Sequence, residues 1–407
     1  MGSVPIFWRV TLPFLAGYFV SYVYRSVNAI IGPDIARELG LSAAGLGLLT
    51  GIYFFAFALF QLPLGVLLDR YGPRRVNATL LLVAAAGGAW FALGQTAFEL
   101  TAARALIGLG VSGCLMASFS AFALWYPPER IATMNGIAFA SGMLGAVFAT
   151  VPLEMALRVL HWREVFAGIV AATVLVSLVL FLVVPERGTA AKGASLAAQW
   201  RGFAQLARDA AFWRAALCIG ASQLAAVSLS TLWVATWLRD VAGYSQAEVA
   251  RALLLFSIAM MFGYVGFGRA ADAMTRRGRS TLPLLAGGVA VASLCLGLLL
   301  AGVRTGMLAL WTVFFVAATA IVLSYSLFSR RYPKEMAGRV NTALNVFVFA
   351  GMFSGQWAVG LLLNLWPATP GGYAPEAYPW ALGLLWVVQF AGLAWLWAGR
   401  RLFYEAR

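Results

Sequence analysis

A polar stripe on the first apolar segment is the feature best suited to binding chemistry. Tyr18, Tyr22, Arg25 and Asn28 follow one another at spacings of four, three and three residues, which places them on one face of a helix. A guanidinium beside two phenols suits a carboxylate, phosphate or sulfonate, because its planar fork can donate to two oxygens at once. The alternative is that Arg25 reaches lipid headgroups, since it lies only about two turns from Pro33.

Arg104 and Glu154 are two further charges inside long apolar segments, and we assign them to coupling. A charge within a bilayer costs several kcal/mol unless it is paired or faces a wet cavity. Each could be half of an ion pair, and Glu154 could carry a proton. The alternative for Glu154 is a helix-end acid that pairs with Arg158, four residues on, or with His161.

The second half of the chain offers neutral amides in place of charges. Gln223, Asn345 and Gln356 could exchange hydrogen bonds with a solute, and Asn345, Met352 and Gln356 share a helical face. The alternative is that these amides join neighbouring helices, which is their commoner role in membranes.

The elements that position these residues are membrane-spanning helices. Hydrophobic residues make up 62% of the chain, charged residues 11%, and the mean hydropathy is +0.84, too apolar for a soluble domain. We therefore expect an all-α integral membrane protein in which about twelve apolar runs cross the bilayer. The expected spans are 10–31, 44–68, 77–95, 98–124, 133–157, 164–185, 214–238, 250–268, 282–303, 307–328, 340–365 and 380–398.

The net charge of +14 is explained by topology. If the chain alternates across the bilayer at each span, most of its arginines fall on one side, which should be cytoplasmic. This places the protein in the inner (plasma) membrane as a multi-pass protein with both termini cytoplasmic, and it makes a nucleic-acid partner unnecessary. The first apolar run carries Arg25 and has no small-residue cleavage site, so it is predicted to be the first span and not a cleaved signal.

The longest hydrophilic stretch divides the chain into two halves. We expect one six-helix bundle over 1–185, a linker over 186–213 and a second bundle over 214–407. Leu196, Trp200, Phe203 and Leu206 recur in the linker at helical spacing, which predicts a short amphipathic helix at the membrane surface. The alternative is a loop without helical structure.

Internal repeats support this division. The run Gly65-Val66-Leu67-Leu68-Asp69-Arg70-Tyr71-Gly72-Pro73-Arg74-Arg75 returns in a weaker form around Asp272, 203 residues after Asp69. Tyr126-Pro127-Pro128-Glu129 is similarly matched by Tyr332-Pro333-Lys334-Glu335. The two halves are therefore expected to be parallel repeats. Arg25, Arg104 and Glu154 have no charged counterpart in the other half, which makes them the strongest functional candidates.

These residues resemble the Major Facilitator Superfamily (MFS). Gly65, Asp69, Arg70, Gly72, Arg74 and Arg75 match the family's loop signature between helices 2 and 3, and Arg104-Ala105-Leu106-Ile107-Gly108-Leu109-Gly110 is similar to its helix 4 element. The resemblance implies twelve helices in two pseudo-symmetric six-helix bundles. It also implies that the loop residues and Asp272 form gates, in which each aspartate contacts the start of a helix near Asn341 or Asn135. The alternative is that both acids only cap their own loops and offset nearby arginines.

One departure bears on the solute. Drug/proton antiporters of the family carry a proline-containing motif in helix 5, whereas this chain reads Ser141-Gly142-Met143-Leu144-Gly145-Ala146. The absence of that proline weighs against multidrug export. We therefore expect a secondary active transporter that moves a small organic solute, an anion by preference, by alternating access. Efflux of hydrophobic or drug-like compounds is the alternative.

Other classes of protein are disfavoured. An intramembrane enzyme needs convergent acids, histidines or a metal site, but the chain has a single histidine, and its three cysteines fall in separate spans. No phosphate-cradling nucleotide loop is visible. We expect no enzyme activity, no cofactor and no metal. The expected partners are a small-molecule solute, the lipid bilayer and a proton as co-substrate, with a monomer as the working unit.

Overall fold

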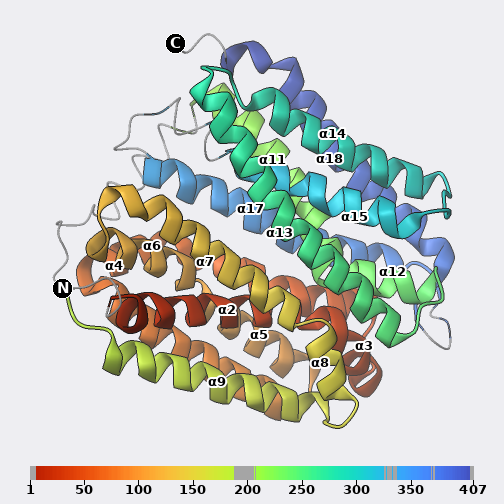
Figure 1. Cartoon of the computed structure of the whole chain (residues 1–407). Helices are drawn as coiled ribbons and strands as arrows, with labels where there is room; N and C mark the ends of the chain where they lie inside the picture. The colour runs from red at the N-terminus through yellow and green to blue at the C-terminus, as the bar shows by residue number, and fades with distance from the viewer. Residues whose placement is uncertain are drawn as a thin grey trace. The chain divides into compact units, whose positions relative to one another are not determined.

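The computed structural model is all-helical (Figure 1). It describes residues 6–187, 206, 208–324, 327, 332, 337–367, 369 and 372–403. Among these residues, ten helices are long and apolar enough to cross a membrane, and a shorter apolar helix covers Met307–Val322. Together with the first helical segment they give the twelve spans of the expected fold, six in each half of the chain.

The chain divides into two compact units, Met1–Leu41 with Leu48–Ala198, and Ser42–Gly47 with Gln199–Arg407. In the first unit, α7 and α9 flank α2 (Figure 1). The helices of the N-terminal half are η1 (Phe7–Thr11), α2 (Leu12–Ser26), α3 (Asn28–Leu39), α4 (Ala43–Leu93), α5 (Ala97–Val111), α6 (Cys114–Trp125), α7 (Pro128–Phe148), α8 (Val151–Leu157) and α9 (Trp162–Val183).

In the second unit, α11 packs against α17 and α18 (Figure 1). Its helices are α11 (Ala210–Ser228), η2 (Leu229–Trp233), α12 (Val234–Asp240), α13 (Gln246–Arg276), α14 (Leu282–Leu300), α15 (Met307–Ala318), η3 (Thr319–Val322), α17 (Ala337–Leu363), η5 (Pro375–Ala377), α18 (Tyr378–Ala398) and η6 (Arg400–Phe403). Most of the linker, including Leu196, Trp200 and Phe203, lies outside the described residues, so the amphipathic helix and the domain boundaries stay predictions.

Two expected boundaries differ from the structure. The second and third spans run almost without a loop, because α4 is broken only at Gly72, whose φ of 79° and ψ of 159° are not helical. Glycine tolerates this conformation without the steric cost of a Cβ, and Pro73 then provides a fixed φ suited to the first turn of the next helix. The loop expected between 68 and 77 is therefore a single sharp break.

The first span is also longer than expected. Helix continues through Pro33 to Leu39, where Gly40 ends it in the left-handed region at φ 60°. An interruption at Val27 separates α2 from α3, and the Ile30 amide there bonds the Val27 carbonyl at 3.1 Å. The expected span ended where the charged residues begin, because such residues lower the hydropathy. A helix that leaves the bilayer can carry charged residues, so it continues for several more turns.

Local signals explain where several helices begin. Thr96 and Glu99 form a capping box at the start of α5, and His161 and Glu164 form another at α9. Each box satisfies amides that have no partner in the first helical turn. Asp209 accepts a hydrogen bond from the Ala211 amide at 2.9 Å and caps α11.

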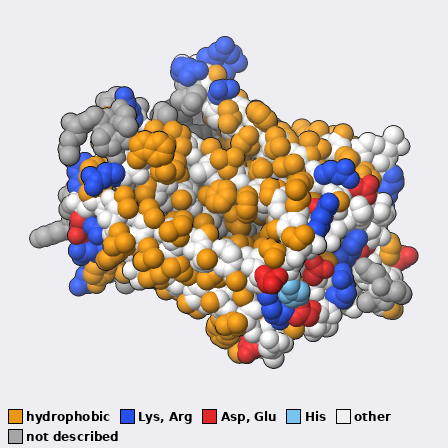
Figure 2. Space-filling view, turned by 60° about the horizontal axis from the view of Figure 1, so that its bottom comes forward, with side chains coloured by type: hydrophobic (Ala, Val, Ile, Leu, Met, Phe, Trp, Pro, Cys, Tyr) orange, Lys and Arg blue, Asp and Glu red, His pale blue; other side chains and the backbone are white. Residues whose placement is uncertain are grey.

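Hydrophobic side chains cover most of the face shown in Figure 2, and charged side chains gather toward its margins. Large apolar side chains are correspondingly exposed on the spans, among them Leu175 and Leu182 on α9 and Phe262 on α13. A soluble protein rarely exposes so many. They are the surface expected to contact lipid.

Candidate functional site

Arg25 lies in an aromatic setting inside the first unit. Its Cζ is 4.6 Å from the ring centroid of Tyr22 on the same helix, and 5.7 and 6.0 Å from those of Phe57 and Phe54 on α4. Tyr18 meets Tyr22 edge to face, with the ring centroids 5.1 Å apart. The structure thus brings Tyr18, Tyr22 and Arg25 together, as the helical spacing predicted. The faces of the aromatic rings attract the guanidinium electrostatically, and this attraction stabilises its charge away from bulk water.

Tyr53 on α4 lies between two arginines. Its ring centroid is 5.1 Å from Cζ of Arg104, and it also interacts with Arg25. Tyr53 is fully buried, and its hydroxyl donates to the Ser21 carbonyl at 3.3 Å. One phenol on α4 therefore links the two charges that the sequence singled out separately, Arg25 on α2 and Arg104 on α5.

Arg104 is a completely buried cation on α5. Its Nη1 donates to the Tyr24 carbonyl at 2.9 Å, and Cζ is 5.9 Å from the Phe91 ring centroid. Within the described part of the chain, its Nε and Nη2 have no hydrogen-bond partner, and no carboxylate pairs with it. A buried charge normally needs such a partner. The region around Tyr53 is therefore electropositive, with the compensating anion not supplied by the described residues.

Asn28 has a different role from its three neighbours on the predicted stripe. It is fully buried, and its Nδ2 donates to Thr50 Oγ1 at 3.0 Å, which joins α3 to α4. Its Oδ1 has no hydrogen-bond partner among the residues described. Asn28 thus stays a candidate contact, but part of its capacity serves the packing of the first two spans.

Glu154 pairs with Arg158. Both carboxylate oxygens accept hydrogen bonds, from Nε at 2.9 Å and from Nη2 at 3.0 Å. The Glu154 side chain is only 8% exposed, whereas that of Arg158 is 61% exposed. This is the helix-end pair that the four-residue spacing allowed. The coupling role of Glu154 stays a prediction.

The amides of the second unit join helices. Gln356 is fully buried, its side-chain Nε2 donates to Thr231 Oγ1 at 2.5 Å, and its backbone carbonyl accepts from Trp233 Nε1 at 3.1 Å. These bonds tie α17 to η2. Asn345 is buried on α17 and Gln223 half-buried on α11, and their assignment to a solute site stays a prediction.

The predicted gating loop surrounds the break in α4. Gly65 lies on the helix before it, Gly72 forms it, and Arg70 and Asp69 are exposed beside it. Arg74 and Arg75 turn toward the end of α9 and contact Glu186. The helix-end contact expected for Asp69 stays a prediction. The side chains of Asp272 and Asn341 lie outside the description.

The main residues that the sequence reasoning missed are on α4. Tyr53, Phe54 and Phe57 face the arginines of the first unit, and Thr50 accepts the hydrogen bond from Asn28. Their spacing of three, one and three residues is a helical face, and it could have been recognised. The signal was hidden because every face of this apolar segment looks suitable for burial.

No group of three or more potential metal-ligating side chains occurs among the residues that the structure describes. The three cysteines, Cys114, Cys218 and Cys295, are buried as separate free thiols. What the described residues offer is a helical bundle whose interior carries two arginines and several phenols.

The chain belongs to the Major Facilitator Superfamily. The family's sequence model matches residues 14–356, and the twelve-helix fold agrees with it. The structure also resembles the crystal structure of a bacterial homolog to the human lysosomal transporter Spinster, described as inward-facing and occupied. The TM-score is 0.83 over 100% of this chain and 99% of that one, at 19% identity. At this identity the likeness concerns the fold alone.

Curated relatives are transporters with different named solutes. A probable sulfoacetate transporter from Cupriavidus necator is 26% identical over 37% of this chain and 35% of its own length. A quinolone resistance transporter from Acinetobacter baumannii is 24% identical over 61% of this chain and 62% of its own length. The matched stretches therefore cover about a third and somewhat under two thirds of these relatives.

Proposed function

We propose that this protein moves a small organic anion across the membrane by alternating access, with Arg25 as the residue that binds the anion. The observation that carries the proposal is the pair of arginines at Tyr53, where Arg104 lies over the ring and Arg25 interacts with the same side chain. A buried cation in an apolar bundle is costly, and no carboxylate among the described residues pairs with Arg104. A carboxylate or sulfonate solute would supply the missing charge.

The aromatic rings define what else the solute needs. Tyr18 and Tyr22 offer phenol hydroxyls beside Arg25, whereas Phe54 and Phe57 offer only apolar faces. A compact anion with a polar end for the guanidinium and a carbon skeleton for the rings fits this mixture. The relative named for sulfoacetate supports the same class of solute. In the second unit, Gln223, Asn345 and Gln356 are the residues that we propose as solute contacts.

Coupling to a proton is the finer part of the proposal. Glu154 is the buried carboxylate of the first unit available for a proton, and its partner Arg158 is exposed. Protonation would release Arg158 and leave a neutral side chain, which changes the net charge that must cross the membrane. Arg104 would then hold the positive charge that attracts the anion in both states.

The second candidate function is efflux of hydrophobic or drug-like compounds. The three aromatic rings near Arg25, those of Tyr22, Phe54 and Phe57, favour it, because they would accept a flat apolar ligand. The relative named for quinolone resistance supports it as well. In that case Arg25 would shape the pocket through cation–π contacts and not bind an anion.

A thermal-shift screen of the purified protein distinguishes the two. We expect sulfoacetate or tartrate to raise the melting temperature by mass action, and an apolar cation such as ethidium not to do so. Arg25→Gln should weaken anion binding by about 10- to 150-fold, the equivalent of a charge-assisted hydrogen bond of about 1.5–3 kcal/mol. Arg25→Lys should also weaken it, because an ammonium lacks the planar fork.

Arg37→Gln is the matched control. It removes an arginine from the same helical segment, but that side chain is 78% exposed and contacts only Asp34 among the groups described, at 3.4 Å. Its anion response should equal that of the unmodified protein. If Arg25→Gln keeps the full anion response, or if only ethidium shifts the melting temperature, the anion proposal fails and efflux becomes the better function.

Orientation and location belong to the same proposal. The arginine-rich ends of the spans are placed in the cytoplasm of a cell whose inner membrane holds the protein, with both termini on that side. Single cysteines at Arg130 and Tyr373, on opposite loops of the predicted topology, should be labelled from opposite sides of the membrane. Labelling of both from one side would exclude this topology.

A further inference from the structure

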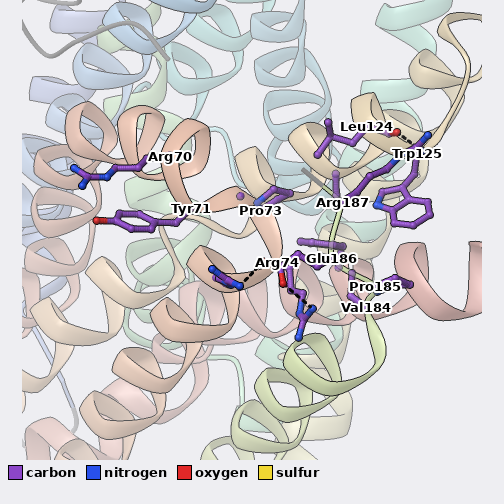
Figure 3. Close-up of a pocket in the computed structure, with 14 residues that line it drawn as sticks. Arg70, Tyr71, Pro73, Arg74, Leu124, Trp125, Val184, Pro185, Glu186 and Arg187 are labelled. Carbon is purple, nitrogen blue, oxygen red and sulfur yellow. Dashed lines mark hydrogen bonds and ion pairs between the residues drawn. The ribbon is translucent and has the colours of Figure 1, made fainter. Parts of the chain in front are cut away.

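A cavity of about 170 Å³ opens at one end of the first unit, away from Arg25. It lies where the break in α4, the end of α6 and the end of α9 meet (Figure 3). All of its lining residues belong to the first unit. The loop signature contributes one wall, but the gating role predicted for that loop does not explain why a cavity should be there.

The cavity is strongly basic. Arg70, Arg74, Arg75 and Arg187 line it, and Glu186 is the one acid among its lining residues. Figure 3 shows Arg70 and Tyr71 at one side and Trp125 with Arg187 at the other, with Arg74 and Glu186 between them. Four guanidinium groups around one carboxylate leave an excess of positive charge, which attracts anions.

Arg187 is held in place at the far side. Its Nη1 donates to the Leu124 carbonyl at 2.6 Å, and its Cζ is 4.9 Å from the ring centroid of Trp125. A guanidinium has five N–H donors, so a single bond to a carbonyl leaves the fork able to bind oxygen atoms. Stacking on Trp125 fixes the plane of that fork, which lowers the entropy cost of binding a ligand.

Arg74 is held in a similar way. Its Nε and Nη2 donate to the Phe181 carbonyl at 3.0 and 2.6 Å. This carbonyl lies near the end of α9, where the last helical turn leaves such groups without amide partners. Arg74 thus fastens α9 to the start of the helix that follows Gly72, and it fixes one wall of the cavity.

Glu186 occupies the place of an anion. Its carboxylate is 2.5 Å from Arg75 Nη2 and 3.9 Å from Arg74 Nη1, so two guanidinium groups share it. The Glu186 side chain is 52% exposed, so it can move aside for a competing ligand. The contact with this accessible carboxylate indicates that the two arginines bind an oxyanion.

We propose that this cavity binds a phosphate ester, and that the arginines Arg75 and Arg187 contact its oxygens. Arginine forks match the tetrahedral oxygens of phosphate as well as those of carboxylate. The helix that begins at Pro73 adds the partial positive charge of its first turn. Phosphate groups reach such a place from two sources, as the headgroup of an anionic phospholipid or as a free phosphorylated solute.

The surroundings favour the lipid source. Phe14, Leu124, Val184 and Pro185 supply apolar walls beside the arginines, which would accept the glycerol and upper acyl carbons of a lipid. The cavity also lies at the ends of membrane-spanning helices, at the depth where headgroups occur. A bound lipid there would tie together α4, α6 and α9 next to the break at Gly72.

Binding of a short-chain lipid to the purified protein tests the proposal. Dioctanoyl phosphatidylglycerol should bind, as measured by native mass spectrometry and by a rise in melting temperature, whereas the zwitterionic dioctanoyl phosphatidylcholine should bind about tenfold more weakly or not at all. Arg187→Gln should weaken phosphatidylglycerol binding by about tenfold or more. Glu186→Gln should strengthen it, because the internal anion is removed.

Arg400→Gln is the matched control. Arg400 also lies on a tryptophan, with its Cζ 5.1 Å from the Trp397 ring centroid, and its Nη1 also donates to a carbonyl, at 3.1 Å. Its replacement should leave phosphatidylglycerol binding unchanged. An equal loss in Arg400→Gln and Arg187→Gln would show general attraction of anionic lipid and overturn the site.

Inorganic phosphate separates the two sources. If millimolar phosphate shifts the melting temperature in an Arg187-dependent manner and phosphatidylglycerol adds nothing, the site holds and its ligand is a soluble phosphate. If Glu186→Gln weakens lipid binding as Arg187→Gln does, the cluster only stabilises the fold and the proposal is overturned. None of these outcomes depends on Arg25 or on the transported solute.

Discussion

Nη1 of Arg104 donates a 2.9 Å hydrogen bond to the carbonyl oxygen of Tyr24, the residue immediately before Arg25. A buried charge on α5 is thereby attached to the backbone of α2, next to the proposed binding residue. The interruption at Val27 lies three residues further on. Arg104 is therefore placed to position Arg25 as well as to attract an anion.

Replacement of Arg104 by methionine should separate stability from function. The cost of burying an unpaired guanidinium is several kcal/mol, which exceeds the roughly 1.5–3 kcal/mol contributed by its charge-assisted hydrogen bond. We therefore expect Arg104→Met to leave the melting temperature of the purified protein unchanged or raised, while anion binding falls by at least about tenfold.

Arg163→Met is the comparison for that experiment. Arg163 has a carboxylate partner in Glu38 and donates to the Gly94 carbonyl at 2.9 Å. Its removal leaves the Glu38 carboxylate without its arginine partner and the Gly94 carbonyl without this donor, so the melting temperature should fall. If Arg104→Met destabilises the protein as strongly as Arg163→Met does, Arg104 is a structural residue and its assignment to function is wrong.

Glu38 makes the stability of the first unit sensitive to acid. Desolvation raises the pKa of its carboxyl, but hydrogen bonds from Trp162 and Arg163 lower it further, so the pKa lies below its ordinary value of 4.5. A folded-state pKa below the unfolded one contributes stability above the unfolded pKa, and this contribution is lost as pH falls through the folded pKa.

The measurement is the melting temperature as a function of pH. The melting temperature of the unmodified protein should fall progressively below about pH 4.5, and we call this part of the curve the acid limb. Glu38→Gln should be less stable at neutral pH, and its acid limb should be less steep. Glu376→Gln, on an exposed turn, provides the control and should keep the acid limb. Parallel acid limbs for the unmodified protein and Glu38→Gln would contradict the prediction.

Much of the fold could be predicted because hydropathy and the repeats report it directly. Apolar runs of sufficient length must become spanning helices, since no other structure satisfies the backbone in lipid. The sharp break at Gly72 was harder to predict, because the charged run from Asp69 to Arg75 looks like a loop although it is helical on both sides of Gly72. The turns of α3 beyond Pro33 were missed for the same reason, because Arg37 and Glu38 look like a loop although they continue a helix.

The candidate site was only partly predictable. Helical spacing placed Tyr18, Tyr22 and Arg25 together, because neighbours on one helix follow from its period alone. The contact of Arg104 with the Tyr24 carbonyl depends on how helices pack, and a side chain bonded to a backbone group leaves no pattern in the sequence. The contribution of Tyr53 was hidden for the same reason.

Asp69 should control the rate of transport more than the affinity for the solute. It is exposed beside the break at Gly72, and a carboxylate at a helix start is stabilised by about 0.3–2 kcal/mol. Loss of that contact in Asp69→Asn should weaken the outward-facing state and reduce turnover about two- to thirtyfold, with little change in anion affinity. The measurement is transport in proteoliposomes together with distances between spin labels on the two halves.

Asp34→Asn is the control for this experiment, since Asp34 forms an exposed pair with Arg37 and exposed pairs contribute little. It should transport at the normal rate. Unchanged turnover and unchanged label distances in Asp69→Asn would show that Asp69 only caps its own loop.

If transport is coupled to a proton, as we propose, Glu154 is the residue expected to carry it and Arg158 its partner. Glu154 is 8% exposed on its side chain and is bonded at both oxygens to Arg158, which is 61% exposed. If Glu154 carries the proton, Glu154→Gln imitates the permanently protonated state. Accumulation of the anion, about tenfold per pH unit for one coupled proton, should then be abolished, while exchange of internal for external anion continues.

Arg158→Gln separates the charge of Glu154 from its ion pair. It removes the partner but keeps the carboxylate, so accumulation in response to an imposed pH gradient should persist, although its pH dependence shifts. Both variants should retain binding, because neither residue contacts Arg25 in the described structure. If Glu154→Gln still accumulates the anion normally in response to a pH gradient, the pair is only a helix-end contact. The proton would then have to be carried by another group.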